Sequence, residues 1–272
     1  MRPALTDGET KANLRLLLTG FFDWQDLGSP PELSRLRENP SGRLLMGGGE
    51  ADGGAAASGR GALAEMLDGA WQREARVEVS VEVLPVVWDV ARRLSYDRYD
   101  VVIHMGLGVY DHDDALLLER GAFHRREGLD ARGVSPATAS FVPGLEIDQV
   151  IRAPAWLDAG LEALDGLVVE GYGVTVKDAR ADNVFLCNET HARALISLAD
   201  QAGGAGPLAA YFIHLPRPRG ANERALALGV KSLIWSLVAQ VHQRASRRAA
   251  QDAIDGLKSE PGVAGEAEID EG

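Results

Sequence analysis

Short apolar runs alternate with helical segments along most of this chain, and this alternation constrains the fold more than any other feature. The apolar runs cover residues 14–20, 99–105, 174–177 and 209–214, and residues 77–84 alternate Val with Glu or Ser. Runs of this length and content are typical of strands, buried on both faces or wet on one. Strands that alternate with helices build a layered domain with the sheet in the middle. We therefore predict a three-layer α/β domain.

The segments between and after the strands favour helices. We predict helices over residues 62–73, 85–94, 188–201 and 222–244. Pro85 stands in the first turn of its predicted helix, where a missing N–H is harmless. The last helix carries apolar residues at three- and four-residue spacing, which indicates core packing.

Residues 14–245 are predicted to form a single domain, because 272 residues of which 46% are hydrophobic can bury one large core. Residues 47–61 hold seven glycines and four alanines, which indicates a flexible insertion within that domain. Residues 1–13 form a polar lead. Residues 246–272 are predicted to be an acidic, disordered tail.

Charge and cysteine content exclude several classes of partner. The 28 Lys and Arg against 40 Asp and Glu give a net charge of -12, which offers no basic surface to nucleic acid or to anionic lipid. We find neither a secretory signal pattern nor an apolar run of about 18 residues that could span a membrane. Cys187 is the only cysteine, so no intramolecular disulfide can form. We expect a cytoplasmic protein without nucleic-acid or membrane partners.

Three residues stand where catalytic groups are expected. Cys187 follows an apolar pair at the predicted start of a helix, where free N–H groups and the helix dipole favour a thiolate. His214 ends an apolar strand and Glu119 ends the apolar run 116–118, so they are candidates for a base and for the carboxylate that orients it. Taken singly, each residue also fits a structural role: a small core residue, a histidine bonded to backbone, or a solvated ion pair.

Together, and in this order, the three segments resemble the motifs of the pyroglutamyl peptidase I family of cysteine peptidases. The similar segments are Phe185-Leu186-Cys187-Asn188 around the nucleophile, Phe212-Ile213-His214-Leu215-Pro216 around the histidine, and Glu119-Arg120-Gly121-Ala122 around the carboxylate. Further similar segments are Thr19-Gly20-Phe21 with Trp24, Asn39-Pro40-Ser41, and Val83-Leu84-Pro85-Val86. The resemblance covers about residues 14–245.

The resemblance implies a three-layer α/β/α sandwich of the phosphorylase/hydrolase-like kind, with a mixed, mostly parallel sheet. It implies a thiol protease, an omega peptidase that removes an N-terminal pyroglutamyl (5-oxoprolyl) residue through a thioester intermediate. Cys187 would attack the carbonyl, His214 would transfer the proton, and Glu119 would hold the imidazole. Phe21 and Trp24 would grip the lactam ring, and Arg132 would bind substrate, although its Asp-Ala-Arg segment lies further along the chain than in the family.

By the same resemblance, the partner is a peptide with a blocked pyroglutamyl N-terminus, and neither a metal nor another cofactor is required. Residues 111–114, Asp-His-Asp-Asp, are not expected to bind a metal, because consecutive side chains diverge. The oligomeric state stays open, and a homo-oligomer is one possibility because family members often form one.

Two segments near the expected site depart from the family pattern. Residues 106–111 lose the double glycine and the arginine of the family's Gly-x-Ala-Gly-Gly-Arg loop. Residues 182–184 replace the family's Ala-Gly-Thr, and Asn183 is expected to preserve the glycine turn because asparagine tolerates a left-handed backbone. A non-catalytic or altered-specificity protein, which binds a peptide end or another small ligand, therefore stays an alternative.

Overall fold

The computed structural model describes residues 13–23, 39–46, 60–108, 114–199, 206–216 and 222–259. Several predictions fall outside these ranges. They concern Trp24, residues 47–59 of the insertion, residues 111–113, the lead at 1–12 and the last part of the tail at 260–272.

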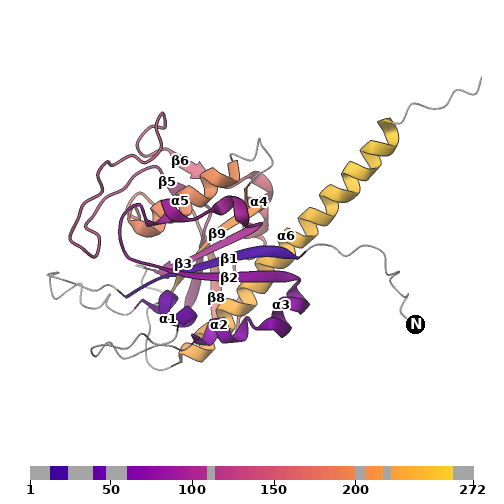
Figure 1. Ribbon diagram of the computed structural model, residues 1–272, viewed down its shortest axis with the longest axis horizontal. Helices are drawn as coiled ribbons and strands as arrows, with labels where there is room; N and C mark the ends of the chain where they lie inside the picture. Colours follow the sequence, from indigo (N-terminus) through magenta and orange to yellow (C-terminus); the bar gives the residue numbers. More distant parts are fainter. Residues whose placement is uncertain are drawn as a thin grey trace, which may run out of the picture.

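A seven-stranded sheet forms the middle layer of the molecule, in the order β2-β1-β3-β9-β4-β8-β7 (Figure 1). Its strands are β1 Leu14–Phe21, β2 Val77–Leu84, β3 Val101–Leu107, β4 Ala115–Glu119, β7 Val168–Val169, β8 Tyr172–Lys177 and β9 Ala209–Leu215. Strands β2, β1, β3 and β9 are parallel, whereas β4 pairs antiparallel with β9 and parallel with β8. Strands β5 Gly121–Phe123 and β6 Val150–Arg152 form a separate antiparallel pair.

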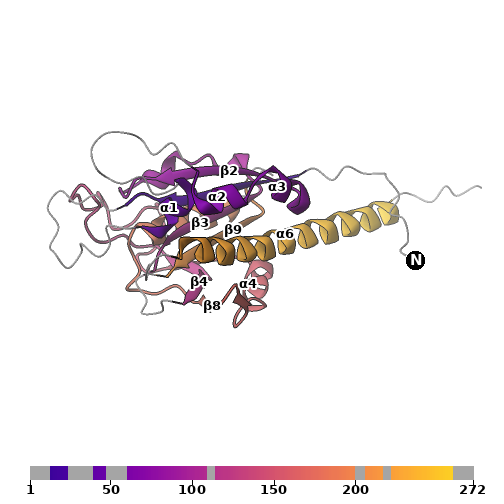
Figure 2. The same cartoon turned by 90° about the horizontal axis from the view of Figure 1, so that it is seen from below.

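Helices cover both faces of this sheet, which confirms the predicted α/β/α sandwich with a mixed, mostly parallel sheet. Helix α5 (Leu186–Ala199) packs on one face, against β3 and β9. The other side carries α6 (Glu223–Ser259), which runs along the molecule beside α2 and α3 (Figure 2). The shorter helices are α1 Pro40–Met46, α2 Ala62–Met66, α3 Gly69–Ala75 and α4 Ala155–Glu162.

The two faces of the central strands differ in polarity, because side chains alternate along a strand. The face toward α5 carries Thr19, His104, Phe212, His214 and Glu119, all of them buried. The opposite face carries mainly apolar residues at the neighbouring positions, namely Leu18, Ile103, Met105, Ile213 and Leu118, together with the buried Tyr211. The polar face beneath α5 is therefore the part of the sheet where chemistry can take place.

Two predicted helices take a different form. Residues 85–94 are irregular up to a short 3-10 helix, η2 (Val90–Arg93), because Asp89 adopts a left-handed backbone with φ 62° that a regular helix cannot contain. Residues 62–73 divide into α2 and α3. The division falls at Asp68, whose side chain caps α3 by accepting a hydrogen bond from Trp71 N.

Helix α6 continues to Ser259, so the predicted disorder is wrong for residues 246–259. This stretch holds three Ala and two Arg and is free of proline, so helix propensity extends α6 beyond the core. Over Glu223–Asp252, α6 is the one described helix that is long and apolar enough to cross a membrane by length and composition alone. Half of its most apolar 18-residue window is buried inside the protein, as in a core helix.

Candidate active site

Glu119 and His214 meet on the face of the sheet beneath α5. Leu117 of β4 pairs with His214 of β9, and Glu119, two residues further along, faces the same side. His214 Nε2 lies 3.1 Å from Glu119 Oε1, and both side chains are 2% exposed. The side-chain amide of Asn183 donates to the same carboxylate oxygen at 2.6 Å. Glu119 thus holds the imidazole of His214 and is itself held by Asn183.

Glu119 is ionised in this setting despite its burial. Burial alone would raise the pKa of the carboxyl group, but the charge and hydrogen bond of His214, the charge of His191 and the hydrogen bond from Asn183 outweigh it and hold the pKa below its usual value. A buried carboxylate beside an imidazole stabilises the protonated form of that imidazole. The pair can therefore accept a proton from a neighbouring group.

Cys187 is the second residue of α5 and lies against the strand pair that carries His214. Gly106 of β3 is in register with His214 of β9. A Cβ atom built on Gly106 would lie 2.8 Å from the Sγ of Cys187 and 3.0 Å from the ring of Phe212. The sulfur therefore packs directly over Gly106, and a larger residue there would displace it. In this way three elements, β4, α5 and β9, bring Glu119, Cys187 and His214 to one region of the sheet.

The thiol of Cys187 is protonated at neutral pH. The residue is only partly exposed. Burial raises the pKa of its thiol to about 12, the negative charge of Glu119 acts in the same direction, and the residue's own backbone amide acts in the opposite one. The expectation that the start of a helix favours a thiolate is therefore wrong for this structure, because desolvation and a buried carboxylate outweigh the helix terminus.

Two further histidines lie on the same face. His104 is hydrogen bonded to Thr19 Oγ1 at 2.7 Å and to Tyr96 Oη at 3.3 Å, and burial lowers its pKa to about 3. His191, one turn after Cys187, packs against Phe212 with ring centroids 5.9 Å apart. Burial lowers the pKa of His191 to about 4, although Glu119 acts in the opposite direction. Both imidazoles are neutral and weakly basic at pH 7, so His214 is the better placed base.

The structure places the predicted substrate-binding residues unevenly. Phe21 ends β1, but its ring is 2% exposed and packs in the core, whereas the next residue, Phe22, is 44% exposed. The guanidinium of Arg132 is bonded to the buried carboxylate of Asp130 at 2.7 and 3.1 Å. Phe21 therefore offers no exposed face, whereas Arg132 is paired with Asp130 but its side chain is 57% exposed. Trp24 lies outside the described residues.

Several asparagine and serine side chains hold the segments around the site. Asn183 does not adopt the left-handed backbone expected of it, and its contribution is the side-chain bond to Glu119. Asn188, next to Cys187, accepts from Phe123 N at 2.7 Å. Ser41, in the Asn-Pro-Ser segment, accepts from the backbone N–H of Phe21 at 2.9 Å. The sequence resemblance marked these segments but gave no partner for any of these side chains.

In the part of the chain that the structure describes, no group of three or more His, Cys, Asp or Glu side chains is arranged to hold a metal ion.

Comparison with known proteins supports a relation at the level of the fold. Neither the family models nor the curated proteins include a match. Among solved structures, pyroglutamyl peptidase I from Bacillus amyloliquefaciens is similar, with a TM-score of 0.55, 17% identity and coverage of 84% of this chain and 97% of that chain. Pyrrolidone carboxyl peptidase from Thermococcus litoralis is similar with a TM-score of 0.52 and 18% identity, and the match covers 87% of this chain and 96% of that chain. A mutant pyrrolidone carboxyl peptidase from Pyrococcus furiosus is similar with a TM-score of 0.55 and 19% identity, and the match covers 84% of this chain and 100% of that chain. The chain shares the fold of these peptidases over most of its length.

Proposed function

We propose that this protein is a cysteine peptidase that removes an N-terminal pyroglutamyl residue from peptides. The observation that carries the proposal is the contact of His214 with Glu119 on the sheet face against which Cys187, the second residue of α5, packs. Nucleophilic acyl transfer requires a thiol as nucleophile, an imidazole as base and a carboxylate that orients the imidazole. The pyroglutamyl substrate class is proposed because the solved structures of similar fold are pyroglutamyl and pyrrolidone carboxyl peptidases.

The reaction begins from a neutral thiol, because the pKa of Cys187 is about 12. His214 takes the thiol proton as Sγ attacks the pyroglutamyl carbonyl, and Glu119 stabilises the imidazolium that forms. With Nε2 of His214 directed at Glu119, Nδ1 is the nitrogen that takes the proton. The imidazolium then protonates the leaving amine, a thioester remains on Cys187, and water hydrolyses it with His214 as the base.

The tetrahedral intermediate needs fixed donors for its oxyanion, and the first turn of α5 supplies candidates. The first intrahelical bond in this turn runs from Glu189 N to Phe185 O. The amides that precede Glu189, including that of Cys187, have no acceptor within the helix. Amides at such a position stabilise a negative oxygen and require no reorganisation during the reaction.

In this proposal the lactam ring binds beyond the end of β1. Phe21 lies buried there and Phe22 offers an exposed aromatic face, so Phe22 is a better candidate for contact with substrate than Phe21. Trp24 stays part of the proposal on the resemblance alone. Because Cys187 must stay reduced, we also propose a reducing compartment such as the cytoplasm.

A binding protein without hydrolytic activity is the second candidate, and one observation favours it. The thiol of Cys187 has a raised pKa and is a weak nucleophile until His214 takes its proton. A scaffold that kept the fold but lost an effective base would bind a peptide end without cleaving it.

Release of a fluorescent amine from a pyroglutamyl amide separates the two functions. We expect turnover by the wild type under reducing conditions between pH 5 and 9, no turnover by Cys187→Ala, and none with the matching prolyl amide, which lacks the lactam carbonyl. Binding of a pyroglutamyl peptide without turnover would favour the second candidate. Undiminished turnover by a folded Cys187→Ala variant would exclude the thiol mechanism.

A further inference from the structure

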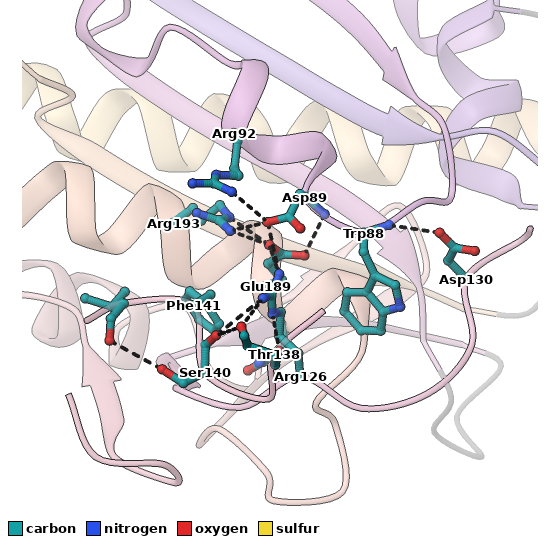
Figure 3. A network of polar contacts seen from close by, with 12 residues as sticks. Trp88, Asp89, Arg92, Arg126, Asp130, Thr138, Ser140, Phe141, Glu189 and Arg193 are labelled. Atoms are coloured by element: carbon teal, nitrogen blue, oxygen red, sulfur yellow. Dashed lines mark hydrogen bonds and ion pairs between the residues drawn. The ribbon is translucent and has the colours of Figure 1, made fainter. Parts of the chain in front are cut away.

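We infer that Arg126 is a positioning residue for Cys187, because it ties the segment that carries Glu119 to the helix that carries Cys187. The inference rests on the proposed function, since it concerns the geometry of the same thiol and imidazole. It depends on a group of charges at the start of α5, shown in Figure 3, in which Arg126 and Glu189 are buried. The sequence did not indicate this group.

Residues 119–126, which we call the strap, connect the two halves of the site. The strap begins at Glu119, whose carboxylate lies 3.1 Å from His214, continues through β5 and ends at Arg126. Its middle is bonded to α5: the side-chain amide of Asn188 donates to Phe123 O at 2.8 Å and to Arg125 O at 3.0 Å. The strap therefore sets where the first turn of α5 lies relative to His214.

Arg126 fixes the far end of the strap to the same turn of α5. Its side chain is 4% exposed, and Nη1 lies 3.0 Å from Asp89 and 3.3 Å from Glu189. Arg193, one turn further along α5, pairs with the same two carboxylates, at 2.9 Å from Asp89 and 2.6 Å from Glu189. Arg126 and Arg193 thus face the same two carboxylates, and the more exposed Arg92 adds a third guanidinium 3.6 Å from Asp89, as Figure 3 shows.

Glu189 is the residue through which this group acts on the nucleophile. It stands two residues after Cys187 and is 1% exposed, so its carboxylate cannot be solvated by water. A buried carboxylate is strongly unfavourable when it loses a partner. Without the guanidinium of Arg126, Glu189 would keep Arg193 of its own helix but lose its bond to the strap. The first turn of α5, and Cys187 with it, would then shift relative to Glu119 and His214.

The contacts of Arg126 are specific to a guanidinium group. Besides the two carboxylates, Nε donates to Thr138 O at 3.1 Å, and Nη2 donates to Thr138 Oγ1 at 2.8 Å and to Ser140 O at 3.3 Å. The ring of Phe141 lies 5.7 Å from the guanidinium carbon. A lysine ammonium would keep the charge but could not make this planar set of bonds. Lysine at this position therefore tests geometry apart from charge.

The backbone conformation of Asp89 adds evidence that the surrounding contacts fix this group of charges in place. Its φ of 62° is a conformation that a non-glycine residue rarely adopts, and its backbone N–H donates to Glu189 Oε2 at 3.2 Å. Strained backbone persists where surrounding contacts determine it, and such residues cluster at functional sites. Arg126 is thus the arginine that connects the loop after Glu119 to the nucleophile helix.

The test is the rate at which iodoacetamide alkylates Cys187, measured from pH 5 to 9 without substrate. We expect Arg126→Lys to lower the rate at pH 7 about tenfold, because a displacement of about 1 Å between thiol and imidazole is costly, and to shift the pH–rate profile towards that of His214→Gln. Arg125→Lys is the matched control, since Arg125 is adjacent but exposed and pairs with Glu127 and Asp148. Its profile should equal that of the wild type.

Thermal melting of each variant separates positioning from stability. A lower melting temperature with an unchanged alkylation profile in Arg126→Lys would overturn the inference, because that is what a merely structural role predicts. If Arg126→Lys does not melt cooperatively, Glu189→Gln, which keeps the side-chain shape, replaces it in the test. The same loss of alkylation rate is then expected, and an unchanged alkylation profile would again overturn the inference. Equal rates for wild type and His214→Gln would instead show that the proposed thiol–imidazole function fails.

Discussion

His214 and Ile213 are consecutive residues of β9, both are almost fully buried, and they face opposite layers of the molecule. His214 faces α5 among a carboxylate, a thiol and two other imidazoles. Ile213 faces the other layer, where its neighbours in the adjacent strands, Met105 and Leu118, are apolar. The same strand thus contributes to chemistry on one side and to cohesion on the other.

This difference shows how the sheet divides its tasks. The apolar face gains free energy from burial, because each side chain removed from water is favourable without requiring a partner. The polar face must provide a partner for every charge, and burial shifts the pKa values of Glu119, Cys187, His104 and His191. Substitutions on the two faces should therefore change different properties of the protein.

The largest effect is expected for His214→Gln. Glutamine can still donate a hydrogen bond to Glu119 but has no basic nitrogen, so kcat for pyroglutamyl amide hydrolysis should fall by about 10³-fold while the fold persists. Steady-state kinetics and circular dichroism check both parts. Retention of more than a tenth of the activity would show that the polar face is not organised around this imidazole.

Ile213→Ala should produce the converse result. A buried Ile replaced by Ala leaves a cavity and should lower the free energy of unfolding by about 2–5 kcal/mol, whereas kcat per folded molecule should hardly change. Denaturant melts and active-site titration measure the two quantities. A large loss of kcat with normal stability would contradict the division between the faces.

Acidification should weaken the polar face through His191. Its folded pKa of about 4 lies below the ordinary value of 6.5, so the unfolded chain binds more protons, and stability is complete above pH 6.5 and falls as the pH drops towards 4. His191→Leu should remove about 3 kcal/mol of this acid sensitivity. Urea melts at pH 7 and pH 4 test this. The half-buried His242 on α6 provides the matched control, His242→Leu, which should retain the wild-type difference.

Glu119→Gln should have a smaller effect on kcat than the loss of His214, about 10- to 100-fold. The amide oxygen still accepts from Asn183 and His214, but the charge that stabilises the imidazolium is lost. A pH–rate profile measures this change. An activity equal to that of the wild type would show that the carboxylate only packs against His214.

The smallest effect is expected for Asn183→Ala, which removes one hydrogen bond to Glu119. The pKa of Glu119 should rise, and kcat should fall about fivefold, as expected for one hydrogen bond of about 1 kcal/mol. Asp182→Ala is the control, because Asp182 is exposed and pairs with Arg180 at the surface. Equal kinetics for the two variants would remove Asn183 from the site.

The layered fold could be predicted from the sequence because its main determinants are local. Apolar runs define β1, β3 and β9. The helix predicted from residue 188 onward is α5, which begins two residues earlier, at Leu186. Residues 85–94 were predicted as a helix because their local pattern favours one. The backbone of Asp89 instead bonds to Glu189, one hundred residues away in the chain, and no local pattern contains that partner.

The candidate site was predictable in its residue types but not in its electrostatics. The motifs around Glu119, Cys187 and His214 indicated a thiol, a base and a carboxylate. The raised pKa of the thiol depends on burial and on the charge of Glu119, which only the packed structure brings together. Arg126 was missed for the same reason, since its carboxylate partners lie 37 and 63 residues away.

Capture of the acyl-enzyme tests the central claim most directly. The wild type would be mixed with an activated ester of pyroglutamic acid, quenched in acid and analysed by peptide mass spectrometry. A thioester consisting of one pyroglutamyl group on Cys187, absent in His214→Gln and absent with the prolyl ester, is the predicted result. Equal release of the alcohol by the wild type and Cys187→Ala, with Cys187 unmodified in the wild type, would contradict the thiol mechanism.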